Sequence, residues 1–308
     1  TDGRAGIEAQ ALGLAEALSF RRPVSILRKR IAVLSPWKNL PRQLWNDPFT
    51  RLDPEGDLLA PPFPDIWIGC GRISVPFSLA VKARNPSTFV VQLQNPRAPL
   101  SAFDLVIAPA HDMIAGANVV SIIGSTAHAH TPRPVNAAGS RQVAALIGGP
   151  NKAFSFTGRE GAAIGDMLRA LASDGVGVKV TTSRRTPPEV AAALEDHLDG
   201  AAEIFWRADR DSADANPYPE MLNAAGAVIT TEDSVNMAVE AASTGVMTHI
   251  YRLPRKPFSS ARKFDVFHES LIVRGNARYF DGDIEWRATE PLNETQRAAD
   301  ELLKRFGA

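Results

Sequence analysis

One carboxylate stands alone in a short apolar stretch of TTEDSVNMAVEAASTG, residues 230–245. Ser234 is a residue type that caps helices, so the segment predicts a strand end, a turn at Asp233 and Ser234, and then a helix. A helix N-terminus attracts anions, and Glu240 follows six residues later, about 9 Å along the axis. That span suits a nucleotide whose diphosphate meets the helix start and whose ribose bonds to the carboxylate. The alternative is that Glu240 belongs to a solvated polar stripe of a surface helix.

Two more polar groups follow predicted strands. Glycines such as Gly148 and Gly149 let backbone N–H groups approach a phosphate, although a tight strand-to-helix turn explains them equally well. Ser183 is followed by Arg184 and Arg185, and adjacent arginines can donate paired hydrogen bonds to a diphosphate. A solvated basic loop is the alternative there. Parallel strands present their carboxyl ends at one edge, so we expect these residues to lie beside the helix start in a nucleotide site.

The opening TDGRAGIEAQ predicts a loop, shaped by Gly3 and Gly6, that enters a helix. If the protein transfers a group to an acceptor hydroxyl, a base in this region must deprotonate that hydroxyl, and Glu8 is the leading candidate, with Asp2 second. The alternative is an ordinary carboxylate favoured by the helix dipole. Because a loop enters the helix with no strand ahead of it, we also expect a preceding strand.

Two patterns suggest metal ligands but lack the surroundings of a metal site. Asp209 and Asp211 have the D-x-D spacing, yet they lie in an acidic loop remote from any glycine turn, so we expect solvated surface. His128 and His130 have no third ligand nearby in the sequence. The sequence therefore predicts no metal and no cofactor.

A basic segment, residues 21–45, carries seven cationic side chains and no acid, with Trp37 and Trp45 among them. Such a segment predicts contact with an anionic membrane surface or a lipid-linked acceptor. We accordingly expect a cytoplasmic protein, either free in the cytoplasm or peripheral to the inner membrane. A crossover helix with a solvated basic side is the alternative.

Composition excludes two classes of protein. The 34 basic and 34 acidic side chains cancel, which argues against a protein that binds nucleic acid through a basic excess. No apolar run reaches the roughly 20 residues needed to span a bilayer. A single cysteine, Cys70, excludes a disulfide framework and fits a reducing cytoplasm.

Predicted strands and helices alternate in two runs, separated by a polar stretch at 128–141. This alternation predicts parallel sheets with helices on both faces, and ligands outside the carboxyl ends of the strands. The fold class is therefore α/β, with two doubly wound, Rossmann-like domains that face each other across a cleft. They cover 1–140 and 141–308. The last helix, 293–306, crosses back to the first domain and begins with a capping box at Asn293.

The element boundaries follow from the apolar runs. We predict strands at 24–29, 65–70, 88–94, 104–109, 118–123, 143–149, 176–182, 202–207, 227–231 and 246–251. We predict helices at 7–18, 72–84, 159–173, 187–198, 217–225, 259–274 and 293–306, and one that starts after Ser234.

The pattern D-S-x5-E-A-x3-G, ending at Gly245, resembles the donor-binding motif of GT-B glycosyltransferases and nucleotide-sugar 2-epimerases. That resemblance implies that the helix start meets the diphosphate and that Glu240 holds the ribose. Over most of 2–300 the chain resembles the mitochondrial-fission "elongated mitochondria" family of plants and its bacterial relatives. The resembling blocks are DGRAGIEAQALGLAEAL, FVVQLQNPRAPLSAFDLVIAPAHD, IGGPNKAF, TTSRRTPPEV, NPYPEML, TTEDSVNMAVEAASTG, KFDVFHESLIVRG and PLNETQRAA.

This resemblance implies a GT-B-like fold with a nucleotide sugar as donor substrate, in which 141–308 is the nucleotide-sugar side and 1–140 is the acceptor side. It adds residues on the acceptor side of the cleft: Gly3, Gly6, Gln10, Arg97 and His111. It leaves three functions open. They are a metal-independent glycosyltransferase for an envelope saccharide or lipid, a non-catalytic scaffold like the plant members that recruit a dynamin-like protein, and a nucleotide-sugar epimerase. Ile7 stands where many bacterial relatives have a polar residue, which counts against catalysis.

Overall fold

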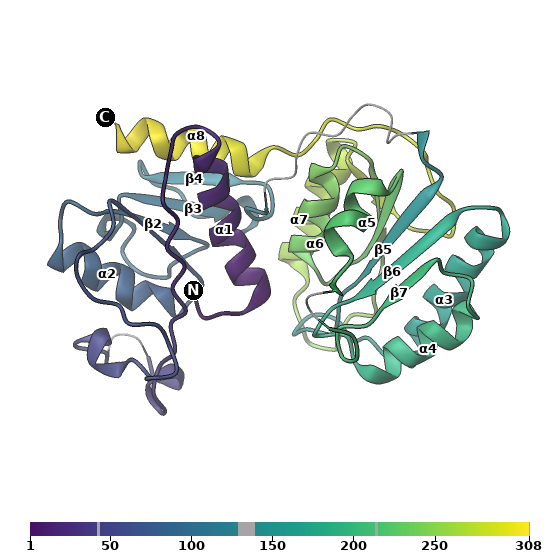
Figure 1. The fold of residues 1–308 in the computed structure, drawn as a ribbon, viewed down its shortest axis with the longest axis horizontal. Coiled ribbons are helices and arrows are strands. Elements are labelled where there is room, and N and C mark those ends of the chain that lie inside the picture. Colours follow the sequence, from purple (N-terminus) through teal and green to yellow (C-terminus); the bar gives the residue numbers. More distant parts are fainter. Residues whose placement is uncertain (42–43, 129–138, 213–214, 308) are drawn as a thin grey trace. The chain divides into compact units, whose positions relative to one another are not determined.

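The computed structural model describes residues 1–41, 44–128, 139–212 and 215–307, in two compact units (Figure 1). Unit 1 comprises Thr1–Ala129 and Asn293–Ala308, and unit 2 comprises His130–Leu292. Each unit has its own parallel sheet, which confirms the α/β class and the two separate sheets. The predicted linker at 128–141 falls mostly on residues outside the described ranges.

Unit 1 contains a four-stranded parallel sheet in the order β1-β2-β3-β4. Its strands are β1 (Ile66–Cys70), β2 (Phe89–Leu93), β3 (Leu105–Pro109) and β4 (Val119–Ile122), and its helices are α1 (Ala5–Ser19), α2 (Ser74–Arg84) and α8 (Glu294–Phe306). Leu14 of α1 and Leu302 of α8 pack on one face of the sheet, whereas Val81 of α2 packs on the other. The strands are apolar throughout because both faces are covered.

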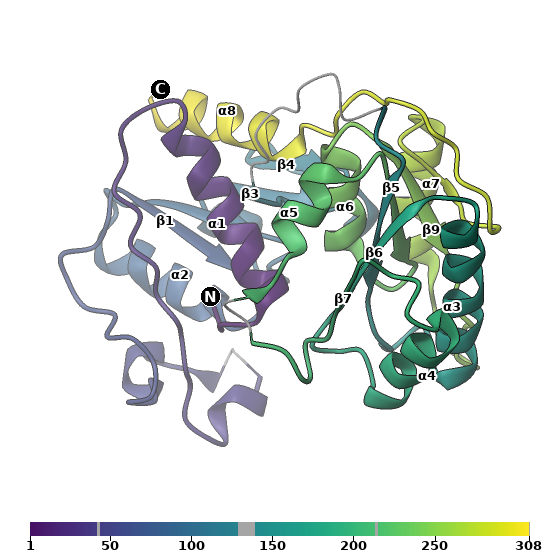
Figure 2. The same cartoon turned by 45° about the vertical axis from the view of Figure 1, so that its right-hand side comes forward.

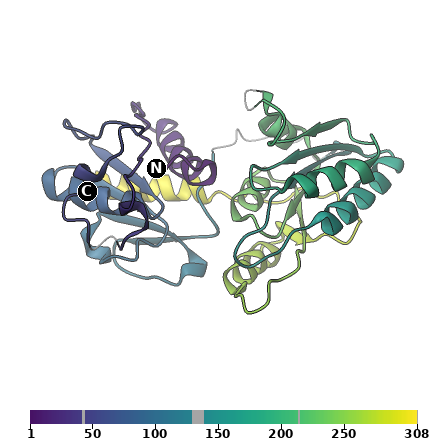
Figure 3. The same cartoon turned by 90° about the horizontal axis from the view of Figure 1, so that it is seen from below.

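The last helix, α8, belongs to unit 1 and lies against α1 (Figure 3). Leu302 is fully buried there, and the ring of Phe306 meets that of Phe89 edge-on at 5.7 Å between centroids. The predicted capping box is wrong, since Asn293 makes no side-chain capping bond. Glu294 instead accepts a hydrogen bond from the Ile123 N–H at 2.8 Å and so ties the helix to the chain after β4.

Residues 24–29, predicted as a strand, form none. Val24, Ile26 and Leu27 are exposed, and the backbone near this segment bonds to the first residue of the chain. The Thr1 ammonium donates to the Lys29 carbonyl at 3.0 Å. An apolar run predicts a strand only where a sheet edge is present to pair with it, and these six residues pair with none.

Unit 2 contains a six-stranded, all-parallel sheet in the order β10-β9-β8-β5-β6-β7. Its strands are β5 (Gln142–Ile147), β6 (Gly177–Thr182), β7 (Ile204–Trp206), β8 (Ala227–Thr231), β9 (Met247–Tyr251) and β10 (Ala277–Tyr279). Its helices are α3 (Gly158–Ser173), α4 (Pro188–Leu198), α5 (Tyr218–Ala224), α6 (Val235–Ser243) and α7 (Arg262–Val273). The short edge strand β10 was not predicted, and α7 begins three residues later than predicted.

The helices of unit 2 divide between the two faces of the sheet (Figure 2). Ile164 of α3 and Leu194 of α4 pack on one face, and Met221 of α5 and Ala241 of α6 pack on the other. The chain therefore leaves β5 and its neighbour β8 toward opposite faces. In open parallel sheets the crevice at such a switch point is where ligands bind.

Candidate functional site

A buried ionic cluster lies at the carboxyl edge of the unit 2 sheet, around the fully buried side chain of Asp233. Its Oδ2 accepts the Gly149 N–H at 3.0 Å and pairs with the Arg185 Nη2 at 2.7 Å. Its Oδ1 accepts the Thr231 hydroxyl at 2.6 Å, and that hydroxyl accepts the Gly148 N–H at 2.9 Å. These five residues, the Asp233 cluster, join the loops that follow β5, β6 and β8.

Burial is the largest influence on the charge of this cluster. It raises the pKa of the Asp233 carboxyl above its ordinary value, although the Arg185 guanidinium and the bonds from Thr231 and Gly149 act in the opposite direction. A carboxylate at this depth requires several donors to stay ionised. The cluster supplies three, so we assign it the role of fixing the three loops.

The contacts of Gly148 and Gly149 agree with the tight-turn alternative. Their N–H groups donate to Thr231 and Asp233. A Cβ on Gly148 would lie 2.3 Å from the Asp233 carboxylate, and one on Gly149 would lie 2.1 Å from the Arg185 carbonyl oxygen. Glycine is required here because the loops approach each other closely.

The two adjacent arginines, Arg184 and Arg185, differ from each other in their contacts. Besides its bond to Asp233, Arg185 donates from Nη1 to the Gly149 carbonyl at 3.0 Å, so its guanidinium serves the cluster. Arg184 is exposed, and no carboxylate within the described ranges pairs with it. The Ser183 hydroxyl accepts the Arg185 N–H at 3.2 Å and thereby shapes the turn. Arg184 is therefore the arginine that can meet a ligand phosphate.

The helix after β8 begins as predicted. The Ser234 hydroxyl accepts the Met237 N–H at 3.4 Å and caps α6. Glu240, in the middle of α6, is only 8% exposed, and its neighbours Val239 and Ala241 are core residues. This excludes the solvated-stripe alternative. A carboxylate in such surroundings costs free energy unless it is hydrogen-bonded.

Tyr218, the first residue of α5, supplies one hydrogen bond to that carboxylate, because its hydroxyl donates to the Glu240 Oε2. Sequence analysis gave Tyr218 no role. Its partner lies 22 residues away, so no local spacing connects the two. The signal available was the block NPYPEML, which the family resemblance included without a function.

The two aspartates of the D-x-D pair, Asp209 and Asp211, contact arginine residues of the same loop. Asp209 pairs with the Arg207 Nη2 at 2.8 Å, and Asp211 accepts the Arg207 backbone N–H at 2.7 Å. Glu195 of α4 accepts from Arg207 and Arg210 at 3.0 and 3.2 Å. This network holds the loop after β7. In the sheet, β7 is the neighbour of β6, one of the strands whose following loops form the Asp233 cluster.

In unit 1, Gln10 of α1 lies at the carboxyl ends of β1 and β2. Its Oε1 accepts from the Gln94 Nε2 at 3.1 Å and lies 3.7 Å from the Cys70 Sγ. Arg97 follows β2 on an exposed loop in the left-handed region, and His111 lies in the 3-10 turn after β3. The carboxyl edge of this sheet thus holds three of the predicted acceptor-side residues.

Both candidate bases are ion-paired within unit 1. Glu8 pairs with Arg28, and Asp2 pairs with Arg4 at 2.7 Å. Gly3 has a left-handed φ of 73°, as a loop glycine requires, whereas Gly6 lies inside the first turn of α1 rather than in the loop before it. Ile7 packs against the core of unit 1.

The basic segment is less exposed and less unbalanced than the sequence predicted. Arg21 pairs with Asp300 of α8, and Arg28 pairs with Glu8, so acids distant in sequence neutralise both. Trp45 is buried against Phe77 rather than at the surface. The part of the segment at 42–43 lies outside the described residues.

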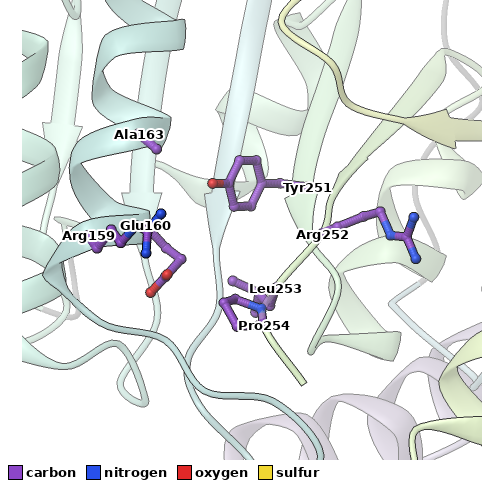
Figure 4. A pocket seen from close by; sticks show the side chains of 7 residues that line it. All are labelled: Arg159, Glu160, Ala163, Tyr251, Arg252, Leu253 and Pro254. Carbon is purple, nitrogen blue, oxygen red and sulfur yellow. The ribbon is translucent and has the colours of Figure 1, made fainter. Parts of the chain in front are cut away.

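An open hollow of about 480 Å³ lies at the end of β9, between this strand and the start of α3 (Figure 4). Tyr251 lines its middle, with Arg159 and Glu160 on the α3 side. The side chain of Arg252 points away from Tyr251 and stacks on Tyr279 at 4.8 Å. None of its lining residues belongs to the Asp233 cluster.

Within the described ranges, no group of three His, Cys, Asp or Glu side chains is able to hold a metal ion. His128 Nδ1 lies 2.9 Å from the Glu16 carboxylate, and His130 is outside those ranges. No described helix is long and apolar enough to cross a membrane.

Fold and site together define a two-unit α/β protein with a buried, loop-fixing ionic cluster and a buried helix carboxylate at the carboxyl edge of one parallel sheet. The chain belongs to the mitochondrial fission ELM1 family, whose model matches residues 5–306. It is 28% identical to protein RP120 of Rickettsia prowazekii over 285 residues, 78% of this chain and 79% of that protein. It is 27% identical to Mitochondrial fission protein ELM1 of Arabidopsis thaliana over 284 residues, 80% of this chain and 64% of that protein's length.

Among solved structures, the chain is similar to S. aureus MnaA with UDP, at 12% identity and a TM-score of 0.47, over 98% of this chain and 87% of that one. It is also similar to UDP-GlcNAc 2-epimerase from Neisseria meningitidis bound to UDP-GlcNAc. That match has 12% identity and a TM-score of 0.41, over 78% and 76% of the two chains. At these values the similarity says nothing about the ligand of this chain.

Proposed function

We propose that the protein binds a nucleotide sugar at the carboxyl edge of the unit 2 sheet. The observation that carries the proposal is Glu240, a nearly buried carboxylate in a short helix whose other inward residues are Ala and Val. Burying a carboxylate contributes little or nothing to stability compared with an apolar residue of similar size. A binding role explains why one is present.

Three features support the ligand class. The carboxylate lies on the helix that follows β8, at the switch point of the sheet. The N-terminus of that helix, capped by Ser234, favours the negative charge of a diphosphate. Arg184, exposed on the neighbouring loop, can add a charge-assisted bond. Glu240 then accepts bonds from the ribose hydroxyls, about 9 Å farther along the helix.

The reaction that we propose is metal-independent transfer of the sugar to an envelope saccharide or lipid. A carboxylate base would take the proton of the acceptor hydroxyl as its oxygen attacks the anomeric carbon and the nucleoside diphosphate leaves. Glu8 is the leading candidate for this base and Asp2 the second.

A non-catalytic scaffold is the second candidate. Family membership favours it, since the Arabidopsis relative is named as a mitochondrial fission protein. The ion pairs of Glu8 and Asp2 with arginines favour it as well, because a general base must be free to accept a proton.

Calorimetry with UDP-, GDP-, ADP- and CMP-sugars tests the proposal. We expect at least one to bind, and we expect Glu240→Gln and Arg184→Ala each to weaken it by about 10- to 150-fold, the loss of a charge-assisted bond. Glu220→Gln, a change at an exposed carboxylate on α5, is the matched control and should bind like the wild type. Binding by none of the four, or equal affinity in Glu240→Gln and Glu220→Gln, would contradict the proposal.

A further inference from the structure

We propose that Tyr218 is a positioning residue that orients Glu240 and makes the nucleotide site selective for an intact ribose. The inference rests on the nucleotide binding proposed above. It follows from the hydrogen bond that the Tyr218 hydroxyl, on a different helix, donates to the Glu240 carboxylate.

Tyr218 is held firmly enough to position another group. It opens α5, and its backbone N–H is bonded by the Asn216 side chain at 3.1 Å. Within the next turn, Met221 and Leu222 are buried in the core that includes Ala241 of α6. The tyrosine ring packs against this same core. Because α5 and α6 share a core, the hydroxyl and the carboxylate keep a fixed relation.

The bond also fixes what Glu240 can accept. A glutamate side chain on a helix has several rotamers, and a bond to one carboxylate oxygen selects among them. The oxygen that accepts the tyrosine hydroxyl is Oε2. Burial and the negative charge of Glu240 raise the pKa of Tyr218 well above its ordinary value, so the phenol remains a donor at every physiological pH.

A preoriented acceptor gives specificity because a ligand that lacks the matching hydroxyl leaves buried polar groups unpaired. Glu240 held by Tyr218 should therefore discriminate a ribonucleotide from its 2′-deoxy counterpart. Without the tyrosine hydroxyl, the carboxylate loses the bond that selects its orientation toward the ribose. The discrimination should then fall, while the contribution of the phosphates stays the same.

The experiment measures the affinity of UDP, GDP, ADP and CMP, each against its 2′-deoxy form, for the wild type, Tyr218→Phe and Glu240→Gln. Phenylalanine keeps the ring and its volume, and the melting temperature and far-UV spectrum check that the variant is folded. Tyr279→Phe removes a hydroxyl from the edge strand β10 and is the matched control.

We expect the wild type and Tyr279→Phe to prefer the ribonucleotide by roughly tenfold or more. Tyr218→Phe should reduce that preference to about two- to threefold and leave the affinity of the 2′-deoxy form unchanged. Because Tyr218 acts through Glu240, adding Tyr218→Phe to Glu240→Gln should change the preference no further.

Two results would overturn the inference, and they are distinguishable. If none of the four nucleotides binds the wild type, the proposed function fails and this inference fails with it. If a nucleotide binds, and Tyr218→Phe keeps the full preference or loses affinity equally for both forms, Tyr218 has a structural role only. An added loss of preference in the double variant would show that Tyr218 acts without Glu240.

Discussion

Replacing Arg185 and replacing Arg184, its neighbour in sequence, should have opposite consequences. Arg185 pairs with Asp233 at 2.7 Å, and the aspartate side chain is completely buried. Arg185→Ala therefore removes the cation from a buried anion. Arg184 is exposed and has no ion pair within the described ranges, so Arg184→Ala should affect ligand binding and leave the fold intact.

The magnitude follows from the exposure of the pair. Removing one partner of a fully buried ion pair costs about 3–5 kcal/mol. The Arg185 side chain is 47% exposed, so water screens part of the interaction. Asp233 also keeps its bonds from Thr231 and Gly149. We therefore expect Arg185→Ala to destabilise unit 2 by about 2 kcal/mol and Arg184→Ala to change stability by less than about 0.5 kcal/mol.

Hydrogen–deuterium exchange of peptides from unit 2 is the suitable assay, because a two-unit chain need not unfold in one step. Peptides that cover β5 and β8 should exchange about 30-fold faster in Arg185→Ala than in the wild type, since 1.4 kcal/mol corresponds to a factor of ten. The Arg184→Ala variant is the matched control. Equal exchange in both variants would refute the distinction between the two arginines.

Three further predictions concern single residues. Burial lowers the pKa of His249 from 6.5 to about 4, so its contribution to stability is complete above pH 6.5 and is lost as pH falls toward 4, by about 3 kcal/mol. The urea concentration at the unfolding midpoint should accordingly fall less between pH 6.5 and pH 4 in His249→Gln than in His197→Gln, the control at an exposed site. An equal fall in the two variants would refute this. Gly149→Ala should destabilise unit 2 by about 1–3 kcal/mol because its Cβ would lie 2.1 Å from the Arg185 carbonyl oxygen, and an unchanged melting temperature would count against it. Glu8→Gln should bind the donor like the wild type and lower turnover on envelope acceptors by about 10²–10⁴, whereas undiminished turnover would remove Glu8 as the base.

The sequence predicted most strands because their apolar runs are buried on both faces. β5 and β8 are examples, and their carboxyl ends then placed Gly148 and Ser234 on one edge. The failure at 24–29 has the opposite cause. Its residues have the same apolar character, yet no strand pairs with them, and pairing is not a local property. The short strand β10 was missed for a related reason, because three residues give too little periodicity.

The sequence predicted which loops form the candidate site, but it did not predict which hydrogen bonds and ion pairs the residues of those loops make. The helix cap at Ser234 depends on neighbouring residues, so local spacing revealed it. The separate roles of Arg184 and Arg185 depend on Asp233, 48 residues from Arg185, and so could not be read from the sequence. The role of Tyr218 could not be predicted for the same reason, because its bond to Glu240 joins two helices that are not adjacent in sequence.

A crystal structure of the protein with the nucleoside diphosphate that binds most tightly would test the central claim most directly. We predict that the ribose hydroxyls bond to the Glu240 carboxylate and that the phosphates lie at the start of α6, within reach of Arg184. A nucleotide bound elsewhere, for example in the hollow beside Tyr251, with Glu240 bonded as it is without ligand, would contradict the account.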